Sequence, residues 1–280
     1  MRDLSTGSRP DNVGAVNESQ VACTLGFDVT EPAEIVLQIA AADQVSEALS
    51  VSSDGRSVEA VELPGRQHLV RAPAGTLTVT YSASVDADRV ASQEVTELDR
   101  IVALRPSRYC PSDRLAGFAG RQFTNQAGEP GTPTETVRAI TDWVFEHLSY
   151  VGGSSGPTTD AVDTLVGAAG VCRDYAHLVA TLCRAMEVPA RVAAVYAPGL
   201  SPMDFHLVVE TALDGQWRVW DATRLAPRQS LIRIATGRDA ADTALATTLS
   251  GRLTMPDLHI TAIAAGNLPL DDHTALVTLP

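Results

Sequence analysis

One cysteine stands where a helix is expected to begin. The stretch GVCRDYAHLVATLCRAMEVPAR, residues 170–191, follows the glycine-containing approach GAAG and carries an apolar stripe at helical spacing from Cys172 to Met186. A thiol in the first turn would feel the positive end of the helix dipole and the free backbone N–H groups, and both favour the thiolate. The same N–H groups could stabilise an oxyanion on an attacked carbonyl carbon. Cys172 is therefore a candidate nucleophile, with a small core residue as the alternative.

The other cysteines lack this setting. Cys183 shares the stripe but lies about three turns further along the helix, and we interpret Cys183, Cys23 and Cys110 as core residues. Cys172 and Cys183 would be about 16 Å apart along the helix axis, too far for a disulfide. The sequence has neither a Cys-x-x-Cys metal spacing nor an Asp-rich calcium loop. No cofactor or metal is therefore predicted.

A nucleophilic cysteine needs a base and a group that orients the base. His177 would point roughly 140° away from Cys172 around the helix, so we expect it to be solvated or to cap. His206 lies in the predicted strand DFHLVVE, and Asp221 ends the next one, QWRVWDAT, after the hairpin turn LDGQ. Singly, each is more often a structural residue. As an ordered set they favour a site in which the imidazole meets the thiol and the carboxylate holds the other ring nitrogen.

The set GVCRDYAHL, FHLVVE and WRVWDAT resembles the transglutaminase-like superfamily, which has Cys, His and Asp in that order. In the superfamily the Cys lies at a helix start and the other two lie on adjacent strands. His206 follows Cys172 by 34 residues and Asp221 follows His206 by 15, gaps that are typical of the superfamily. Papain-type enzymes have a much larger Cys–His gap and are disfavoured. The resemblance covers residues 105–251 well and the preceding half less specifically, as the region before this domain in bacterial relatives.

The resemblance implies an α+β fold. It implies a papain-like transglutaminase core, with a helix packed on an antiparallel sheet, preceded by a β-sandwich-like N-terminal domain. It also implies roles: Cys172 as nucleophile with its backbone N–H in the oxyanion hole, His206 as general acid and base, and Asp221 as the orienting residue.

The chemistry that the resemblance implies is acyl transfer from an amide through a thioester acyl-enzyme. Water as acceptor gives a peptidase or amidase, and an amine gives a transglutaminase or amide synthase; both stay open. The expected partner is a peptide or protein amide, with an amine as second substrate if the reaction is transfer. An inactive binding or scaffold protein is the alternative, although such domains usually lack one of the three residues. A redox or metal protein is disfavoured by the cysteine spacing.

Three further residues are candidate substrate contacts. Tyr150, just upstream of the cysteine helix, is a candidate second oxyanion donor. Asp204, in the segment SPMDF before the histidine strand, could form the rim of a cleft, and an ordinary loop is the alternative. Arg238, in GRDAADTA, could bind a polar substrate group, with a helix start and a local ion pair as the alternative.

The elements that must position these residues fall into two halves. Residues 19–104 hold short runs rich in Val, Leu and Thr between turn signals such as SSDGR and APAG, which predicts a small β-sandwich or open barrel. The proline-containing LRPSRYCPSD marks a linker or an ordered crossing into a catalytic domain over 105–280. There we expect a helix from Thr134 that ends at two glycines, 152 and 153, and a short one capped by Asp160. The segment RLTMPDLHITAIAAG could add a late strand.

Composition limits the partners. The chain has 280 residues, 45% of them hydrophobic and 20% charged, with a formal net charge of −13. This charge disfavours nucleic acids and anionic membranes. No run approaches the roughly 18 apolar residues that span a bilayer, and the polar start resembles no signal peptide. We expect a disordered tail over 1–18 and a cytoplasmic protein, while the sequence predicts no oligomeric state.

Overall fold

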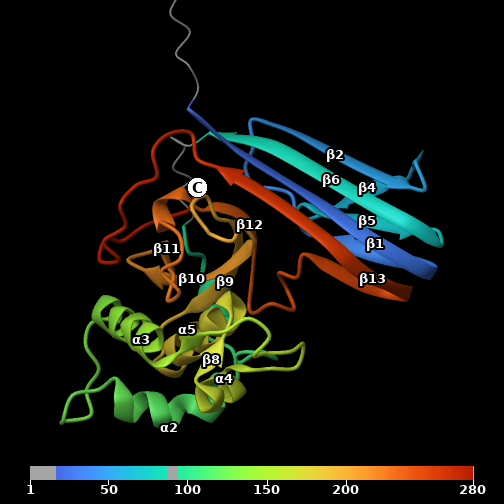
Figure 1. Cartoon of the computed structure of the whole chain (residues 1–280). Helices are drawn as coiled ribbons and strands as arrows, with labels where there is room; N and C mark the ends of the chain where they lie inside the picture. The colour runs from blue at the N-terminus through green and yellow to red at the C-terminus, as the bar shows by residue number, and fades with distance from the viewer. Residues whose placement is uncertain (1–16, 87–93, 280) are drawn as a thin grey trace, which may run out of the picture.

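The N-terminal half forms an antiparallel sheet in the computed structural model, which describes residues 17–86 and 94–279. Valines and leucines alternate with polar residues along its strands, so one face of each strand is buried. One strand comes from near the end of the chain and runs beside the first (Figure 1). The strands are β1 (Glu18–Leu37), β2 (Ser46–Ser53), β3 (Arg56–Ser57), β4 (Ala60–Leu63), β5 (Gln67–Ala72), β6 (Gly75–Asp86) and β13 (Ala246–Ile263).

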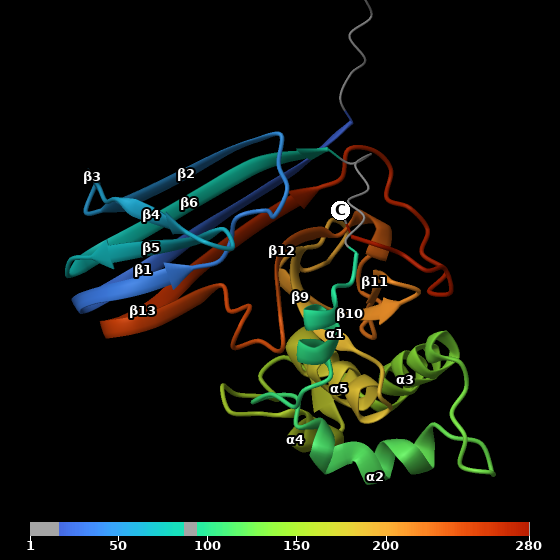
Figure 2. The ribbon, with the colours of Figure 1, turned by 180° about the vertical axis from the view of Figure 1, so that it is seen from behind.

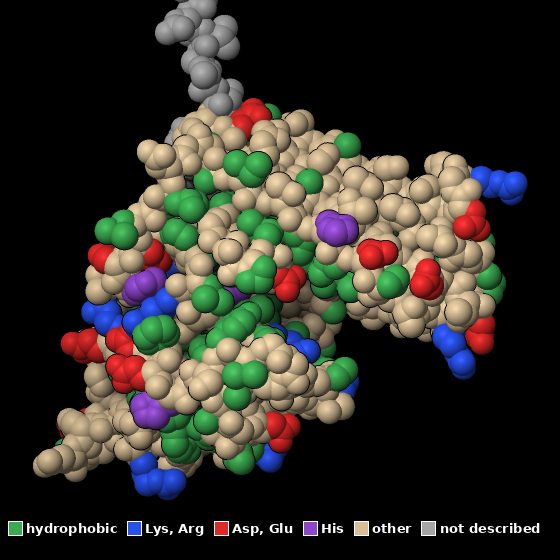
Figure 3. All heavy atoms as spheres, in the orientation of Figure 1, with side chains coloured by type: hydrophobic (Ala, Val, Ile, Leu, Met, Phe, Trp, Pro, Cys, Tyr) green, Lys and Arg blue, Asp and Glu red, His purple; other side chains and the backbone are tan. Residues whose placement is uncertain are grey.

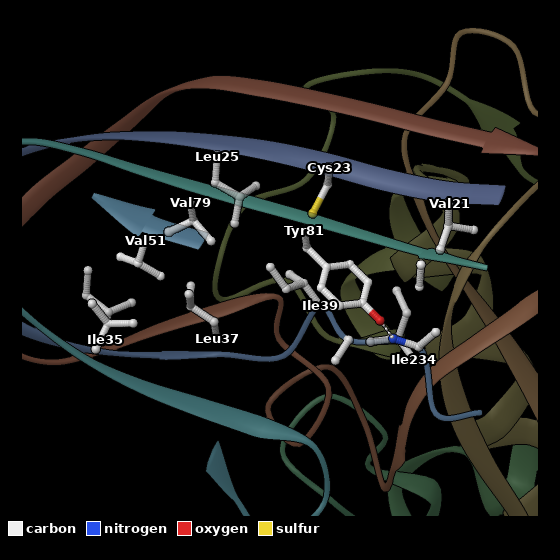
Figure 4. Close-up of a cluster of buried hydrophobic side chains, with 14 of the residues drawn as sticks. Val21, Cys23, Leu25, Ile35, Leu37, Ile39, Val51, Val79, Tyr81 and Ile234 are labelled. Carbon is white, nitrogen blue, oxygen red and sulfur yellow. Dashed lines mark hydrogen bonds between the residues drawn. The ribbon is translucent and has the colours of Figure 1, made fainter. Parts of the chain in front are cut away.

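The long strand β1 makes this sheet sandwich-like. Its first part pairs with β6 as far as Val29, and its last part pairs with β5 from Ala33 onward. Side chains of the two parts face each other across a buried core, with Leu25 on one side and Ile35 and Leu37 on the other (Figure 4). The predicted β-sandwich-like N-terminal region is confirmed, with β1 contributing to both layers.

A second antiparallel sheet has the strand order β11–β10–β9–β12. Its strands are β9 (Ala190–Tyr196), β10 (Phe205–Leu213), β11 (Gln216–Trp220) and β12 (Ile232–Gly237). β10 and β11 form the predicted hairpin, and the turn residues Asp214 and Gly215 have φ values of 51° and 73°. Positive φ at both central residues is the type I′ arrangement that matches the twist of the two strands.

The helices gather on the second sheet. They are α1 (Glu97–Ala103), α2 (Ser112–Gln122), α3 (Pro133–His147), α4 (Ala161–Gly167) and α5 (Cys172–Ala185), with a 3₁₀ turn at Arg228–Ser230 and a short parallel bridge between β7 (Ser149–Tyr150) and β8 (Ala169–Gly170). α5 packs against β9 and β10, and α2, α3 and α4 cover its outer side (Figures 1 and 2). The α+β core of a helix on an antiparallel sheet is thus confirmed. Within residues 17–86 and 94–279, no helix has the length and apolar character needed to cross a membrane.

The predicted division of the chain at residue 104 differs from the structure in two places. β13 belongs to the stretch 105–280 but pairs with β1 from Gln20–Ile263 to Leu37–Ala246. α1 interrupts the range that was predicted to be all strand. The N-terminal sheet is therefore completed by the C-terminal part of the chain. Of the predicted tail, residues 1–16 lie outside the described residues.

Helix ends follow local capping. Asp160 caps α4 as predicted, since its carboxylate accepts hydrogen bonds from the N–H groups of Val162 and Asp163. The helix expected to run to the glycine pair at 152 and 153 ends earlier, at His147. It stops because Leu148 is extended and the next two residues enter β7. The segment 104–113, interpreted as a linker or an ordered crossing, runs directly into α2, which begins at Ser112.

Candidate active site

The start of α5 is held by a buried carboxylate. Asp174, fully buried, accepts a hydrogen bond of 2.8 Å from the N–H of Val171, the residue before Cys172. A Cβ at position 170 would lie 2.5 Å from the Cβ of Asp174, so only glycine fits there. The GAAG approach therefore lets the aspartate pack against the chain and fix Cys172 as the first helical residue.

Exposure separates Cys172 from the other cysteines. Cys172 is half-buried, whereas Cys23, Cys110 and Cys183 are buried. Burial raises the pKa of Cys110 to about 11 and that of Cys183 to about 12, although Arg184 opposes the rise in both. The interpretation of these three cysteines as core residues is confirmed.

The structure brings His206 and Asp221 together. His206 lies in β10, Asp221 follows the last residue of β11, and the imidazole Nε2 is 2.8 Å from a carboxylate oxygen. Burial alone would lower the pKa of His206, but the charge and hydrogen bond of Asp221, with a smaller contribution from Cys172, raise it well above its usual range. Burial likewise opposes the lowering of the Asp221 pKa, which its partners bring about. Both shifts favour the pair of an imidazolium and a carboxylate.

Thr223 fixes the carboxylate and was not singled out from the sequence. Its hydroxyl donates to Asp221 over 2.7 Å, and its backbone N–H donates to the same oxygen over 2.8 Å. These bonds leave the other carboxylate oxygen for His206. The signal was present in the sequence as WDAT, because a hydroxyl residue two positions after an aspartate can close such a turn.

The second ring nitrogen of His206 is the one available to the cysteine. Nδ1 is buried and has no hydrogen-bond partner within the described part of the chain. Cys172 is one of the groups that act on the pKa of His206, and the two residues line the same cleft. The site thus contains the thiol of Cys172, the imidazole of His206 and the carboxylate of Asp221. These three groups are the set that nucleophilic acyl transfer uses.

The cleft of Cys172 and His206 has a volume of about 130 Å³ and mostly apolar walls. Its wall residues come from β9, β10, β12 and the segment before β13: Ala194, Phe205, Leu207, Ile234, Ala240 and Leu245. Gln38, directly after β1, also lines it, so the N-terminal half contributes to the site. Hydrophobic side chains gather on the surface where the upper, sheet-rich part meets the lower helices (Figure 3). Among the described residues there is no group of His, Cys, Asp or Glu that could hold a metal ion.

Tyr150 lies near Cys172, and Asp204 directly precedes Phe205, a residue of the cleft. Tyr150 is paired with Gly170 in the β7–β8 bridge. Burial, followed by Cys172, raises the pKa of its hydroxyl to about 12, while the backbone N–H of Cys172 opposes the rise. The charge of Asp204 contributes in the same direction as the burial. The structure therefore places Tyr150 near Cys172, while the substrate contacts of Tyr150 and Asp204 stay predictions.

Arg238 is not brought to this cleft. It lines a separate pocket of about 210 Å³ with Arg191 and Trp217, and its guanidinium binds Asp242 over 2.8 Å. Of the two interpretations of GRDAADTA, the local ion pair is present, but no helix begins there because the chain turns after β12.

His177 is neither solvated nor capping, and that expectation is wrong. Its side chain is fully buried, its Nε2 accepts a hydrogen bond of 3.0 Å from the N–H of Ala240, and its ring stacks on Tyr109. Burial lowers the pKa of His177 to about 3, although Asp239 opposes this. The segment after β12 covers this face of α5, which the helix periodicity by itself could not indicate.

The comparisons with known proteins agree with this geometry. The model of the transglutaminase-like superfamily matches residues 121–222, a range that contains all three residues of the candidate site. A solved structure from Cytophaga hutchinsonii, described as a candidate cysteine protease, is 32% identical, with a TM-score of 0.79, and the match covers 92% of this chain and 95% of that one. The chain belongs to the transglutaminase-like superfamily. The resemblance seen in GVCRDYAHL, FHLVVE and WRVWDAT is thereby confirmed.

The chain is also similar to an uncharacterized protein of Mycobacterium leprae. It is 28% identical over 197 residues, which are 62% of this chain and 68% of that protein. Superfamily membership and the Cytophaga structure together indicate a cysteine-type enzyme.

Proposed function

We propose that this superfamily member is a cysteine-dependent peptidase or amidase with Cys172 as nucleophile, His206 as general acid and base, and Asp221 as orienting residue. The supporting observation is the buried His206–Asp221 pair, whose histidine lines the same cleft as Cys172. A solved relative described as a candidate cysteine protease supports hydrolysis as the outcome. Transfer to an amine is the same chemistry with another acceptor.

The first half of the reaction forms the acyl-enzyme. The imidazolium of His206 favours the thiolate, because a positive charge beside a thiol stabilises its anion. The sulfur of Cys172 bonds to the amide carbonyl carbon, and the C=O electron pair moves to the oxygen. The N–H of Cys172 and the hydroxyl of Tyr150 are the proposed donors to this oxyanion. When it collapses, the C–N bond breaks, and His206 gives its proton to the departing amine.

The second half releases the acyl group. Water attacks the thioester carbonyl while His206, now neutral, takes the water proton, and the C–S bond breaks to release the carboxylic acid. Asp221 stabilises the imidazolium each time it forms and keeps Nδ1 directed at the reacting groups. An amine in place of water would give a new amide.

The test is the rate at which each cysteine is alkylated by iodoacetamide between pH 5 and 9. Peptide mass spectrometry reads all four cysteines at once, with Cys183 as the internal control. We expect Cys172 to react far faster than Cys183, to stay reactive at the acid end of the range, and to lose that advantage in His206→Ala. Equal, slow alkylation of Cys172 and Cys183 in the wild type would refute the assignment.

Incubation of casein with and without a fluorescent primary amine then distinguishes the acceptors. New casein fragments that depend on Cys172 indicate hydrolysis. Fluorescence attached to intact casein indicates transfer.

A further inference from the structure

Gln38 enters the cleft from the other half of the molecule. It follows β1 directly, its backbone N–H donates to the carbonyl of Leu245 over 2.9 Å, and only 9% of the residue is exposed. The next residues, Ile39 and Ala40, are almost completely buried. The backbone of Gln38 is therefore held in place, and the residue lines the same cleft as Cys172 and His206.

The carboxamide of Gln38 has no hydrogen-bond partner among residues 17–86 and 94–279. Its atoms are also absent from the fully enclosed polar atoms without a partner in that part of the chain. The carboxamide is therefore not fully enclosed, and Gln38 is one of the residues that line the cleft. By contrast, the side chain of Gln20 is bonded to Ser84 over 2.8 Å although the pair is exposed. A polar side chain this buried ordinarily has a partner.

The groups around the cleft indicate which kind of ligand could bond to the carboxamide of Gln38. A carboxamide offers N–H donors and a C=O acceptor, which together complement a peptide group. Around it stand apolar side chains, among them Phe205, Leu207 and Ile234. The lining has two cationic side chains, and both have partners. Arg173 is bonded to Ser155 and to the carbonyl of Gly156, and the imidazolium of His206 is paired with Asp221. The surroundings therefore suit a neutral, apolar group with one peptide bond to satisfy.

The volume limits that group to about one side chain. The cleft measures about 130 Å³, and an apolar cavity of about 150 Å³ binds benzene. A leucine-sized or phenylalanine-sized side chain fits this space. A charged one would lose its hydration, and the two cationic groups of the lining, Arg173 and His206, are already bonded to other groups.

We propose that Gln38 binds a peptide group of the substrate and that the cleft takes an uncharged apolar side chain from the residue that supplies the acyl group. This inference rests on the proposed function, since it needs Cys172 to be the group that attacks. It makes the N-terminal sheet a part of substrate recognition.

The experiment uses two chloromethyl ketones, one built on acetyl-leucine and one on acetyl-aspartate. The thiolate of Cys172 bonds to the probe methylene and chloride leaves, and mass spectrometry gives the second-order rate. The full-length wild type is compared with Gln38→Met, which keeps the side-chain length but removes the carboxamide. Gln20→Met is the matched control on an exposed glutamine. Methyl methanethiosulfonate, which carries no amide, measures the reactivity of the thiol itself.

We expect the leucine probe to react at least about 10-fold faster than the aspartate probe with the wild type, the size of effect that one buried hydrogen bond or one apolar group supplies. Gln38→Met should lower the rate of the leucine probe by about 10-fold, and Gln20→Met should leave it unchanged. An unchanged leucine-probe rate in Gln38→Met overturns the inference. Equal losses with the leucine probe and with methyl methanethiosulfonate also overturn it, because they indicate a disturbed thiol.

The failure of the proposed function looks different. If methyl methanethiosulfonate does not prefer Cys172 over Cys183 in the wild type, Cys172 is not activated, and both proposals fall. If it does prefer Cys172 but the two ketones react equally, only the inference about Gln38 and the apolar cleft is overturned.

Discussion

The pKa values of two buried histidines in the same half of the molecule are shifted in opposite directions. His177, on α5, is surrounded by Tyr109 and the chain near Ala240, and burial lowers its pKa to about 3. His206, on β10, is buried as deeply, yet its pKa is raised because Asp221 outweighs the burial. Burial therefore does not decide whether a histidine is neutral or charged.

The difference lies in where the nearest carboxylate points. Asp239 acts on His177 only through space, because its two oxygens accept from the N–H groups of Tyr109 and Ala241. One oxygen of Asp221 is bonded to Thr223, and the other is directed at the imidazole. A carboxylate that is fixed and aimed by its neighbours makes a buried histidine an acid–base group; otherwise the ring is a structural residue.

The largest expected effect on this contrast between the two histidines comes from Asp221→Asn. An asparagine keeps the shape but cannot hold the imidazolium or select its tautomer, so we expect amide turnover to fall by about 10⁴-fold. Turnover of a casein substrate and the alkylation profile of Cys172 both measure this. Asp239→Asn, at the other histidine, is the matched control and should leave turnover unchanged. If Asp221→Asn and Asp239→Asn lowered turnover equally, the proposed difference between His206 and His177 would be contradicted.

Replacing His177 should affect stability and not catalysis. In His177→Leu the N–H of Ala240 loses its acceptor in a buried setting, so we expect the free energy of unfolding to fall by about 1–3 kcal/mol. Urea denaturation measures this loss. Cys172 should keep its rate of alkylation. A loss of that reactivity in a folded variant would place His177 in the site.

The lowered pKa of His177 also predicts how stability depends on pH. The pKa of His177 is about 3 in the folded state and about 6.5 in an unfolded chain. The unfolded state therefore binds more protons between these values, and stability is complete above pH 6.5 and is lost as the pH falls. The loss from this group is about 1.4 kcal/mol per pH unit. Urea midpoints from pH 7 to 4 should fall less steeply in His177→Leu than in the wild type, and parallel slopes would contradict the assignment.

Thr223→Val should give the smallest effect. The valine removes the hydroxyl that donates to Asp221 but leaves the backbone N–H bond to the same oxygen. One hydrogen bond to a charged group corresponds to a loss of about 10-fold. We expect Cys172 alkylation near pH 6 to slow by that factor, and Thr223→Ser to restore it. A full loss in both variants would indicate a structural role.

Much of the site could be predicted because its signals are local. The helix stripe from Cys172, the Asp160 cap and the LDGQ turn depend on residues within a few positions of each other, and all three are present. The order of Cys172, His206 and Asp221 also matched a known superfamily. Arg238 lines a separate pocket, which its closeness in sequence to the site strands could not indicate, because that closeness does not give the side on which a turn leaves the sheet.

By itself the sequence determined the cysteine at a helix start, the histidine and aspartate on paired strands, and the alternation of buried residues that makes two sheets. Periodicity, capping and turn chemistry act over a few residues, so they can be recognised from the sequence without knowledge of the tertiary structure. Only the tertiary structure decided that β13 completes the first sheet beside β1 and that Gln38 lines the same cleft as Cys172. It also decided that the pKa of His177 is lowered while that of His206 is raised. Each of these depends on which surfaces pack together and on what water they exclude, and neither property is carried by neighbours in the chain.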